Sequence, residues 1–194
     1  MFQYLTSIRP GSFRSSFLSL TGLAVLTFFV LSFAQRAHSA VAIVAWDQEV
    51  WVTGYKVYWG VSSRNYSYTV DARNNSVSTI TNLPSTTYFI AATAYDNDGN
   101  ESGFSDELVI DATTASAGAG GTVSPSGSFF QTRGDTQTFI ITPTLGYQVS
   151  SVLGDEVSVG AVTSYTLSNI NFSHGISAGF SPQVGITFCT DFRA

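Results

Sequence analysis

The sequence of 194 residues has one cysteine, Cys189, and two histidines, His38 and His174. A single cysteine excludes an intramolecular disulfide framework and a cysteine-rich zinc site. No second histidine or reactive cysteine accompanies His174 after the N-terminal segment, so neither a Ser-His-Asp nor a Cys-His arrangement can be assembled. We therefore expect a protein that is not an enzyme, with no catalytic residues, no metal ligands and no cofactor.

Charged residues are also scarce, at 11% of the chain, whereas soluble domains average about a quarter. The net charge is −5, and clustered Lys and Arg that would neutralise phosphates are missing, so no nucleic-acid partner is expected. Hydrophobic residues make up 44% and aromatic residues 14% of the sequence, which predicts a folded chain. A partner should be neutral, cationic or hydrophobic.

Residues 1–39 have the order of a secretory signal peptide. Arg9 and Arg14 precede an apolar segment, and the small residues Ala37 and Ser39 place the cleavage before Ala40. The alternative is an uncleaved N-terminal anchor, because the apolar segment is long enough to span a bilayer when tilted. Export to the cell surface or the medium is expected, with membrane contact only through this segment if it stays uncleaved.

Residues 40–111 alternate between apolar and polar side chains, as strands packed on one side do. Within residues 54–60, Tyr55 points inward, and Lys56 and Tyr58 point outward. The expected strands are residues 41–46, 54–60, 66–70, 77–81, 87–95 and 107–110.

Four motifs in this region resemble a bacterial fibronectin type III domain: Trp46, the Gly54-Tyr-Lys-Val-Tyr strand, the Leu83-Pro84…Thr87-Tyr88 corner and the turn over residues 94–102. The resemblance implies an immunoglobulin-like β-sandwich in which Trp46, Tyr55 and Tyr88 are structural. Tyr88 would be the tyrosine-corner residue, whose hydroxyl bonds upstream backbone. The family's first strand has no clear counterpart after Ala40, which predicts an open sheet edge and an edge-strand dimer.

Residues 112–120 have no bulky side chain and predict a flexible linker. Short strands follow in residues 121–181, without helical periodicity, so the whole chain is expected to be all-β. The strands expected there are residues 121–127, 136–143, 146–153, 157–160, 164–169 and 174–180. The tail, residues 182–194, continues neither module, and its Cys189 is either a leftover thiol or the link of a disulfide-bonded dimer.

The second module is similar to the divergent internalin B-repeat family of bacterial surface and secreted proteins. The similarity is in four strings: residues 120–127, 139–147, 157–160 and 173–180. Asp155-Glu156 stands where relatives usually have Asp-Gly in a hairpin turn, and Glu tolerates positive φ poorly. The resemblance implies a second small β-module of a surface protein.

Trp51 and Tyr58 are the candidate ligand contacts, because flat aromatic side chains stack on sugars or anchor protein partners. Asp96-x-Asp98-Gly99-x-Glu101 has the oxygen spacing of a calcium loop, but it is too short for an EF-hand, and a plain hairpin turn is the other interpretation. The leading hypothesis is a non-enzymatic interaction or spacer protein with an unidentified protein or glycan partner. The alternative is an accessory carbohydrate-binding fragment of a polysaccharide-acting enzyme.

Overall fold

The computed structural model describes residues 29–30 and 40–184, which form strands and loops and contain no helix. The predicted all-β class is therefore confirmed. Nowhere in these two ranges is there a helix long and apolar enough to cross a membrane. The signal peptide predicted over residues 1–39 lies outside the described residues except for Phe29 and Val30, and so does Cys189.

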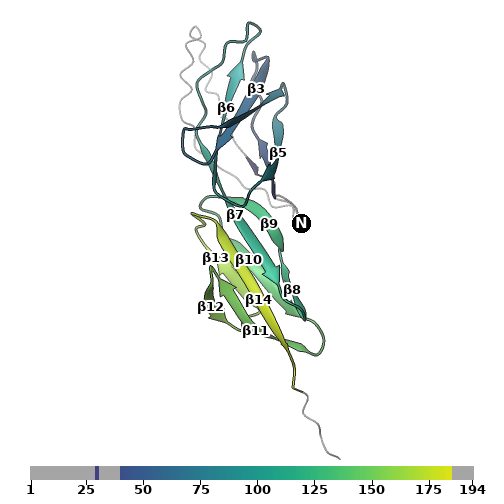
Figure 1. The fold of residues 1–194 in the computed structure, drawn as a ribbon. Coiled ribbons are helices and arrows are strands. Elements are labelled where there is room, and N and C mark those ends of the chain that lie inside the picture. The colour runs from purple at the N-terminus through teal and green to yellow at the C-terminus, as the bar shows by residue number, and fades with distance from the viewer. Residues whose placement is uncertain (1–28, 31–39, 185–194) are drawn as a thin grey trace, which may run out of the picture.

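The first module is a β-sandwich of two antiparallel sheets (Figure 1). One sheet has the order β1-β2-β5, and the other includes β7-β6-β3-β4. The strands are β1 (Phe29–Val30), β2 (Ala40–Ala45), β3 (Gly54–Gly60), β4 (Tyr68–Arg73), β5 (Val77–Leu83), β6 (Tyr88–Tyr95) and β7 (Leu108–Ala117). This sandwich of three strands packed on four is a fibronectin type III-like fold, as the sequence motifs predict.

Alternation within the strands builds the core of this module. In β3, Tyr55 and Val57 are buried between the sheets, whereas Lys56 and Tyr58 reach the outer face. Trp46 and Tyr88 are also buried, so the three structural residues of the fibronectin motifs, Trp46, Tyr55 and Tyr88, all lie in this core. Such burial supplies about 25 cal/mol per Å² of apolar surface.

The second module packs a three-stranded sheet, β13-β10-β8, against β12, β11, β14 and the end of β7 (Figure 1). Its core includes Phe139, Ile141, Val152, Ile170 and Ile176. The strands are β8 (Gly121–Ser124), β9 (Gly127–Thr132), β10 (Gln137–Pro143), β11 (Tyr147–Gly154), β12 (Val157–Gly160), β13 (Ser164–Leu167) and β14 (His174–Pro182).

The predicted linker over residues 112–120 is wrong for its first six residues, because these residues are the second half of β7. There β7 pairs antiparallel with β9 and parallel with β14. Ala112, Thr113 and Ala115 are buried. Their side chains are small because the strand is buried where the two cores meet. The absence of large side chains, which predicts a flexible linker, therefore comes here from close packing. One sheet thus runs from the first module into the second.

Strand β9, which the sequence analysis missed, contributes to both cores. Phe130 packs in the first core, where its ring lies 5.7 Å from that of Tyr88, and Phe129 packs in the second. Two adjacent aromatic residues that are both buried break the apolar–polar alternation that identifies a strand packed on one side. The ring partner of Tyr88 is thus Phe130, and the hydrogen bond implied by the tyrosine corner stays a prediction.

Buried polar side chains line the junction between the modules. Asp111 is fully buried, and its carboxylate accepts two hydrogen bonds from Arg133. Nε donates to Oδ2 and Nη2 donates to Oδ1, both at 3.0 Å. Thr87 Oγ1 donates to Asp111 Oδ1 at 2.5 Å. Further along β7, Thr113 Oγ1 donates to Gln131 Oε1 at 2.9 Å. These contacts fix β7 to β9 and to the start of β6.

The outer edge of β2, expected to be open, is paired over two residues. Phe29 aligns with Ala45 and Val30 with Val44 in an antiparallel ladder. In the uncleaved chain β1 thus takes the place of the missing first strand. The open edge expected after cleavage before Ala40 stays a prediction. The sequence assigned residues 29–30 to the apolar part of a signal, because their composition fits both roles.

The hairpin between β11 and β12 turns on Asp155 and Glu156, whose φ values are 50° and 66°. Two consecutive positive φ values across a two-residue loop are typical of a type I′ turn. Asp155 is held by β14, since Gly175 N donates to Oδ1 at 2.8 Å and His174 Nδ1 lies 2.7 Å from Oδ2. The chain therefore takes the turn that Asp-Gly favours, with Glu at the glycine position.

Candidate functional site

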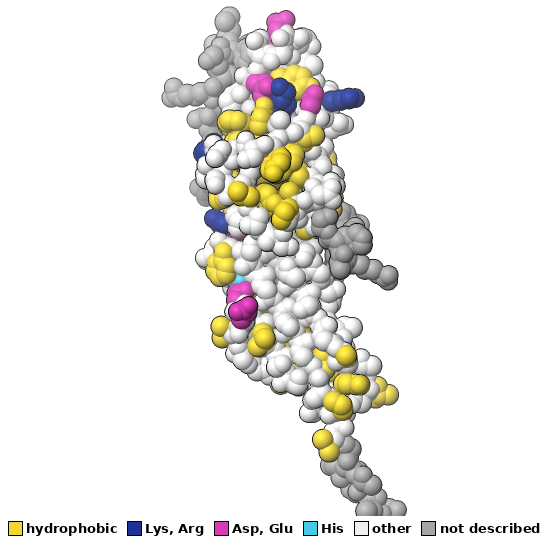
Figure 2. Space-filling view, viewed as in Figure 1, with side chains coloured by type: hydrophobic (Ala, Val, Ile, Leu, Met, Phe, Trp, Pro, Cys, Tyr) yellow, Lys and Arg dark blue, Asp and Glu magenta, His cyan; other side chains and the backbone are white. Residues whose placement is uncertain are grey.

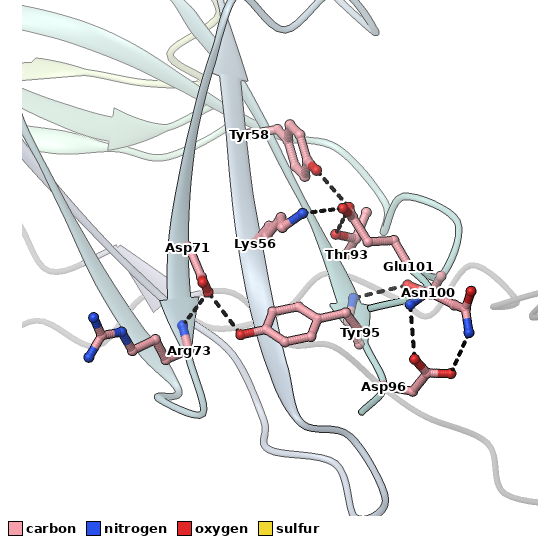
Figure 3. A network of polar contacts seen from close by, with 11 residues as sticks. Lys56, Tyr58, Asp71, Arg73, Thr93, Tyr95, Asp96, Asn100 and Glu101 are labelled. Carbon is pink, nitrogen blue, oxygen red and sulfur yellow. Dashed lines mark hydrogen bonds and ion pairs between the residues drawn. The ribbon is translucent and has the colours of Figure 1, made fainter. Parts of the chain in front are cut away.

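The outer face of β3 and β6 has a polar network centred on Glu101 (Figure 3). Oε1 of Glu101 accepts a hydrogen bond from Lys56 Nζ. Oε2 accepts from Tyr58 Oη at 2.6 Å and from Thr93 Oγ1 at 2.9 Å. A bridge between the backbones of Tyr95 and Glu101 brings the carboxylate over the sheet. The network follows from strand alternation, because Lys56, Tyr58 and Thr93 all point to the same side.

A second set of contacts joins β6 to the edge strand β4. Tyr95 Oη donates to Asp71 Oδ1 at 3.1 Å, and the same oxygen accepts from Arg73 N at 2.8 Å. Lys56 Nζ lies 5.9 Å from the centre of the Tyr95 ring, within the range of a cation–π contact. In Figure 3 the guanidinium of Arg73 points away from Asp71. This part of the face is therefore ordered by its own polar contacts.

Three aromatic side chains, Tyr58, Tyr66 and Phe104, form a cluster beside this network, which we call the aromatic face. The ring of Phe104 lies 5.1 Å from that of Tyr58 and 5.0 Å from that of Tyr66. Phe104 is 47% exposed. Glu107 borders the cluster and accepts from Tyr66 Oη at 2.8 Å. Figure 2 shows hydrophobic side chains gathered on the upper module with charged ones above them.

Hydrogen bonding keeps the two carboxylates of this face ionised. Burial alone would raise the pKa of Glu101, but the hydrogen bonds from Lys56, Tyr58 and Thr93 outweigh it, and the pKa lies below its ordinary value. The pKa of Glu107 is lowered in the same way, against the effect of burial, by Ser63, the Arg64 backbone and Tyr66.

The pKa values of the two phenols of the aromatic face, Tyr58 and Tyr66, are raised, whereas those of the carboxylates are lowered. Burial, and then the hydrogen bond to Glu101, raise the pKa of Tyr58. Burial, and then the hydrogen bond to Glu107, likewise raise the pKa of Tyr66. Both phenols therefore remain neutral hydrogen-bond donors at physiological pH, and the face offers fixed rings and fixed anions rather than an acid–base pair.

Residues 47–53 connect β2 to β3 and form what we call the Trp51 loop. The loop is anchored to the sandwich at two places. Glu49 N donates to the buried Tyr55 hydroxyl at 2.6 Å, and Thr53 N donates to the Tyr95 carbonyl at 2.8 Å. The backbone between these anchors therefore has a defined path.

The tip of the Trp51 loop projects into solvent. Val50 is 77% exposed and Trp51 is 88% exposed. Trp51 has a φ of 75°, a left-handed conformation that bulky residues rarely adopt. A hollow of about 420 Å³ lies beside it, lined by residues 48–52 and Asn74. The tip is thus a protruding apolar surface next to a hollow with a mixed polar and apolar lining.

The loop with calcium-like spacing is a hydrogen-bonded turn. Oδ1 of Asp96 accepts from the backbone N of Asp98 and of Asn100, both at 2.9 Å, and Oδ2 accepts from Asn100 Nδ2 at 3.0 Å. These bonds, those from Asn100 first, lower the pKa of Asp96. The carboxylate therefore stabilises the turn, and across residues 40–184 no group of three or more His, Cys, Asp or Glu could hold a metal ion.

His174 lies in the second module at the start of β14. Its ring packs on Phe172, with centroids 4.1 Å apart, and its Nδ1 bonds Asp155. Asp155 also lines a shallow groove of about 450 Å³, together with Thr114 and Ser116 of β7. Because Asp155 is bonded to both His174 and the backbone of Gly175, the pair fixes the β11–β12 turn against β14.

The structure places the two predicted ligand contacts, Trp51 and Tyr58, in different surroundings. Trp51 stands at the loop tip beside the hollow, and Tyr58 lies in the aromatic face with its hydroxyl bound to Glu101. The two rings do not form one platform. Sequence reasoning missed Phe104, Glu101 and Glu107 as members of a surface, because they come from a loop whose path over the sheet leaves no periodic signal.

No family model matches the sequence, and no curated protein matches it. Among solved structures, the chain is similar to the central fibronectin III array of RIM-binding protein, with 14% identity and a TM-score of 0.29 over 77% of this chain and 58% of that one. It is also similar to the FN1–FN3 domains of chicken CNTN1, with 13% identity and a TM-score of 0.34 over 81% and 71% of the two chains. The chain thus spans less than two thirds of the first of these structures.

Proposed function

We propose that this chain is an exported, non-enzymatic connector that holds an interaction surface at a fixed distance and angle from its other end. The observation that supports this role is the continuity of β7, which is a strand of both modules. Figure 1 shows the modules end to end, with β7 running from one into the other. A spacer works by shape, and a shared strand keeps the shape constant.

The physical argument for stiffness comes from what bending would break. A hinge within residues 112–117 would have to open the ladders that β7 makes with β9 and β14. It would also expose Asp111, whose buried carboxylate depends on Arg133. Each buried hydrogen bond that is left unmade costs roughly 1–3 kcal/mol. A bent form is therefore rare compared with the straight one.

Export belongs to the proposal as well, and the order of residues 1–39 supports it: basic residues, an apolar segment and then small residues. Removal of these residues leaves 5 basic and 13 acidic residues, a net charge of −8. Such an acidic surface favours solubility and resists anionic partners. N-terminal sequencing of the exported product should begin at Ala40.

The connector role is tested by the rotational diffusion of the purified chain, measured residue by residue from ¹⁵N relaxation. Amides of both modules should report one anisotropic tumbling motion, with rates that depend on bond orientation and not on module. A variant with several glycines inserted both after Ala112 of β7 and between Phe129 and Phe130 of β9, the two strands that join the modules, is the matched control, and its modules should tumble separately. Separate tumbling in the unaltered chain would overturn the connector role.

A further inference from the structure

Val50 and Trp51 are the only consecutive pair of exposed large hydrophobic residues in the described part of the chain. Burying such a pair against a partner would remove more apolar area from water than any single exposed side chain of the protein offers. Tryptophan is also the residue type most enriched among binding hot spots, together with tyrosine and arginine.

The pair is held in place before any partner arrives. Glu49 N is bonded to the hydroxyl of Tyr55, and the ring of Tyr55 lies 5.4 Å from that of Trp46 in the core. Gln48 Nε2 donates to the Asn74 carbonyl at 2.7 Å, which ties the loop to the neighbouring turn. A fixed loop loses little conformational entropy on binding, and this lowers the cost of association.

Carboxylates predominate around this pair. Asp47 and Glu49 precede it in sequence, and Glu49 lines the hollow beside it. The loop that holds Asp96 and Asp98 is joined to Thr53, two residues after Trp51, because Thr53 Oγ1 donates to Asn97 Oδ1 at 2.7 Å and Thr53 N donates to Tyr95 O. Of the basic residues in the described part of the chain, Lys56 on β3 is paired with Glu101, and Arg73 at the end of β4 adjoins Asn74 of the hollow.

We propose that the Trp51 loop docks a lysine- or arginine-bearing segment of a partner protein. The cation would lie over the indole of Trp51, where the ring face attracts positive charge, and the surrounding carboxylates would strengthen that attraction. Aliphatic parts of the same side chain would cover Val50. A neutral sugar could stack on the indole, but it would gain nothing from the carboxylates, and anionic partners would be repelled.

This inference adds a ligand class to the connector and does not depend on the modules being rigidly joined, so the two ideas fail separately. The test uses a short peptide of alternating Lys and Gly, with a Glu-Gly peptide as the anionic counterpart. Binding is followed by tryptophan fluorescence. Trp46 is 3% exposed and Trp59 is stacked on Tyr68, so Trp51 is the indole whose emission a ligand should change.

The Lys-Gly peptide should change the emission, and its affinity should fall as salt rises. Trp51→Ala should weaken binding about threefold to tenfold, and Trp51→Phe less. For Trp51→Ala, which removes the fluorescent probe, calorimetry replaces the emission signal. Glu49→Gln and Asp98→Asn should each weaken binding by a smaller factor. Leu145→Ala, at a side chain that is 99% exposed in the other module, and Glu156→Gln are the matched controls and should change nothing.

Three results would overturn the proposal. One is equal binding of the Glu-Gly peptide. Another is unchanged affinity in Trp51→Ala when its unfolding midpoint shows an intact fold. The third is tighter binding of neutral oligosaccharides that is insensitive to salt, which would assign the loop to glycans instead.

Discussion

Arg133 forms a two-pronged ion pair with Asp111, in which Nε and Nη2 each lie 3.0 Å from a different carboxylate oxygen. Asp111 is fully buried on β7, and Arg133 directly follows β9, with its side chain 39% exposed. The pair therefore spans the point where the two modules join. Hydrogen bonding to Asp111 raises the pKa of the Arg133 guanidinium, so Arg133 stays charged at any physiological pH.

Replacing Arg133 with Met should lower the free energy of unfolding by about 3 kcal/mol, because the substitution leaves the buried Asp111 carboxylate without its charged partner. Urea denaturation followed by circular dichroism measures the change. Arg73→Met, which alters an exposed arginine on β4, is the control and should stay within about 0.5 kcal/mol of the unaltered protein. Equal effects of the two substitutions would contradict the importance of the pair.

Acid should destabilise the first module through Glu101 and Glu107. Both have folded-state pKa values below the ordinary 4.5. Their stabilising effect is therefore complete above pH 4.5 and is lost as the pH falls through the lowered folded-state values. Glu101→Gln should make the dependence of unfolding free energy on pH shallower on the acid side.

Glu49 supplies the control of opposite sign for this pH experiment. Burial raises its pKa, so the folded state gains stability from Glu49 as the pH falls. Glu49→Gln removes that gain and should make the loss of stability in acid steeper. Urea titrations at a series of pH values from neutral to acid compare the two variants, and parallel curves for both would refute the assignment.

The type I′ turn predicts that Glu156→Gly stabilises the protein. Glu156 has a φ of 66°, a conformation that costs a residue with a Cβ about 1 kcal/mol and glycine nothing. The unfolding free energy should rise by up to about 1 kcal/mol. Asp155→Gly at the neighbouring position should give no such gain, because it removes the contacts to His174 and Gly175.

Gly121 has no room for a side chain. A Cβ at this position would lie 2.2 Å from Cε1 of Phe180, a partly buried ring packed on the second core. Gly121→Ala should cost about 1–3 kcal/mol, as overpacking does. Gly175→Ala is the control, because nothing lies within 4 Å of its added Cβ. Thermal unfolding midpoints of the two variants test this difference, and the midpoint of Gly121→Ala should be the lower of the two.

The period-two pattern predicted most strands of this fold to within two or three residues. Residues 54–60 and 157–160 are strands with the predicted bounds. In residues 54–60 the buried Tyr55 and Val57 alternate with the outward-facing Lys56 and Tyr58, as the pattern predicts. The burial of Trp46, Tyr55 and Tyr88 follows from the same alternation. What alternation cannot predict is β7 beyond residue 111, where the strand is enclosed by β9 and β14 and small residues occupy both sides.

The candidate surfaces divide in the same manner. The exposure of Trp51 could be anticipated, since the residue lies between two predicted strands and belongs to the apolar–polar alternation of neither. The aromatic face could not, because Phe104 and Glu101 reach Tyr58 from a loop more than forty residues away, and nothing local determines that meeting. Contacts between distant segments depend on the tertiary fold and leave no periodic trace in the sequence.

The continuity of β7 also determines where this polypeptide can be divided. A cut in the alanine-, serine- and glycine-rich stretch, which looks like the natural place to separate the two halves, would split a strand and leave β9 and β14 without their shared neighbour. Each fragment would then expose strand edges with unpaired backbone N–H and C=O groups, which promote aggregation. The part of β7 that joins the two modules should likewise resist limited proteolysis, because a protease needs a flexible segment. The two modules should therefore stay intact or be degraded together.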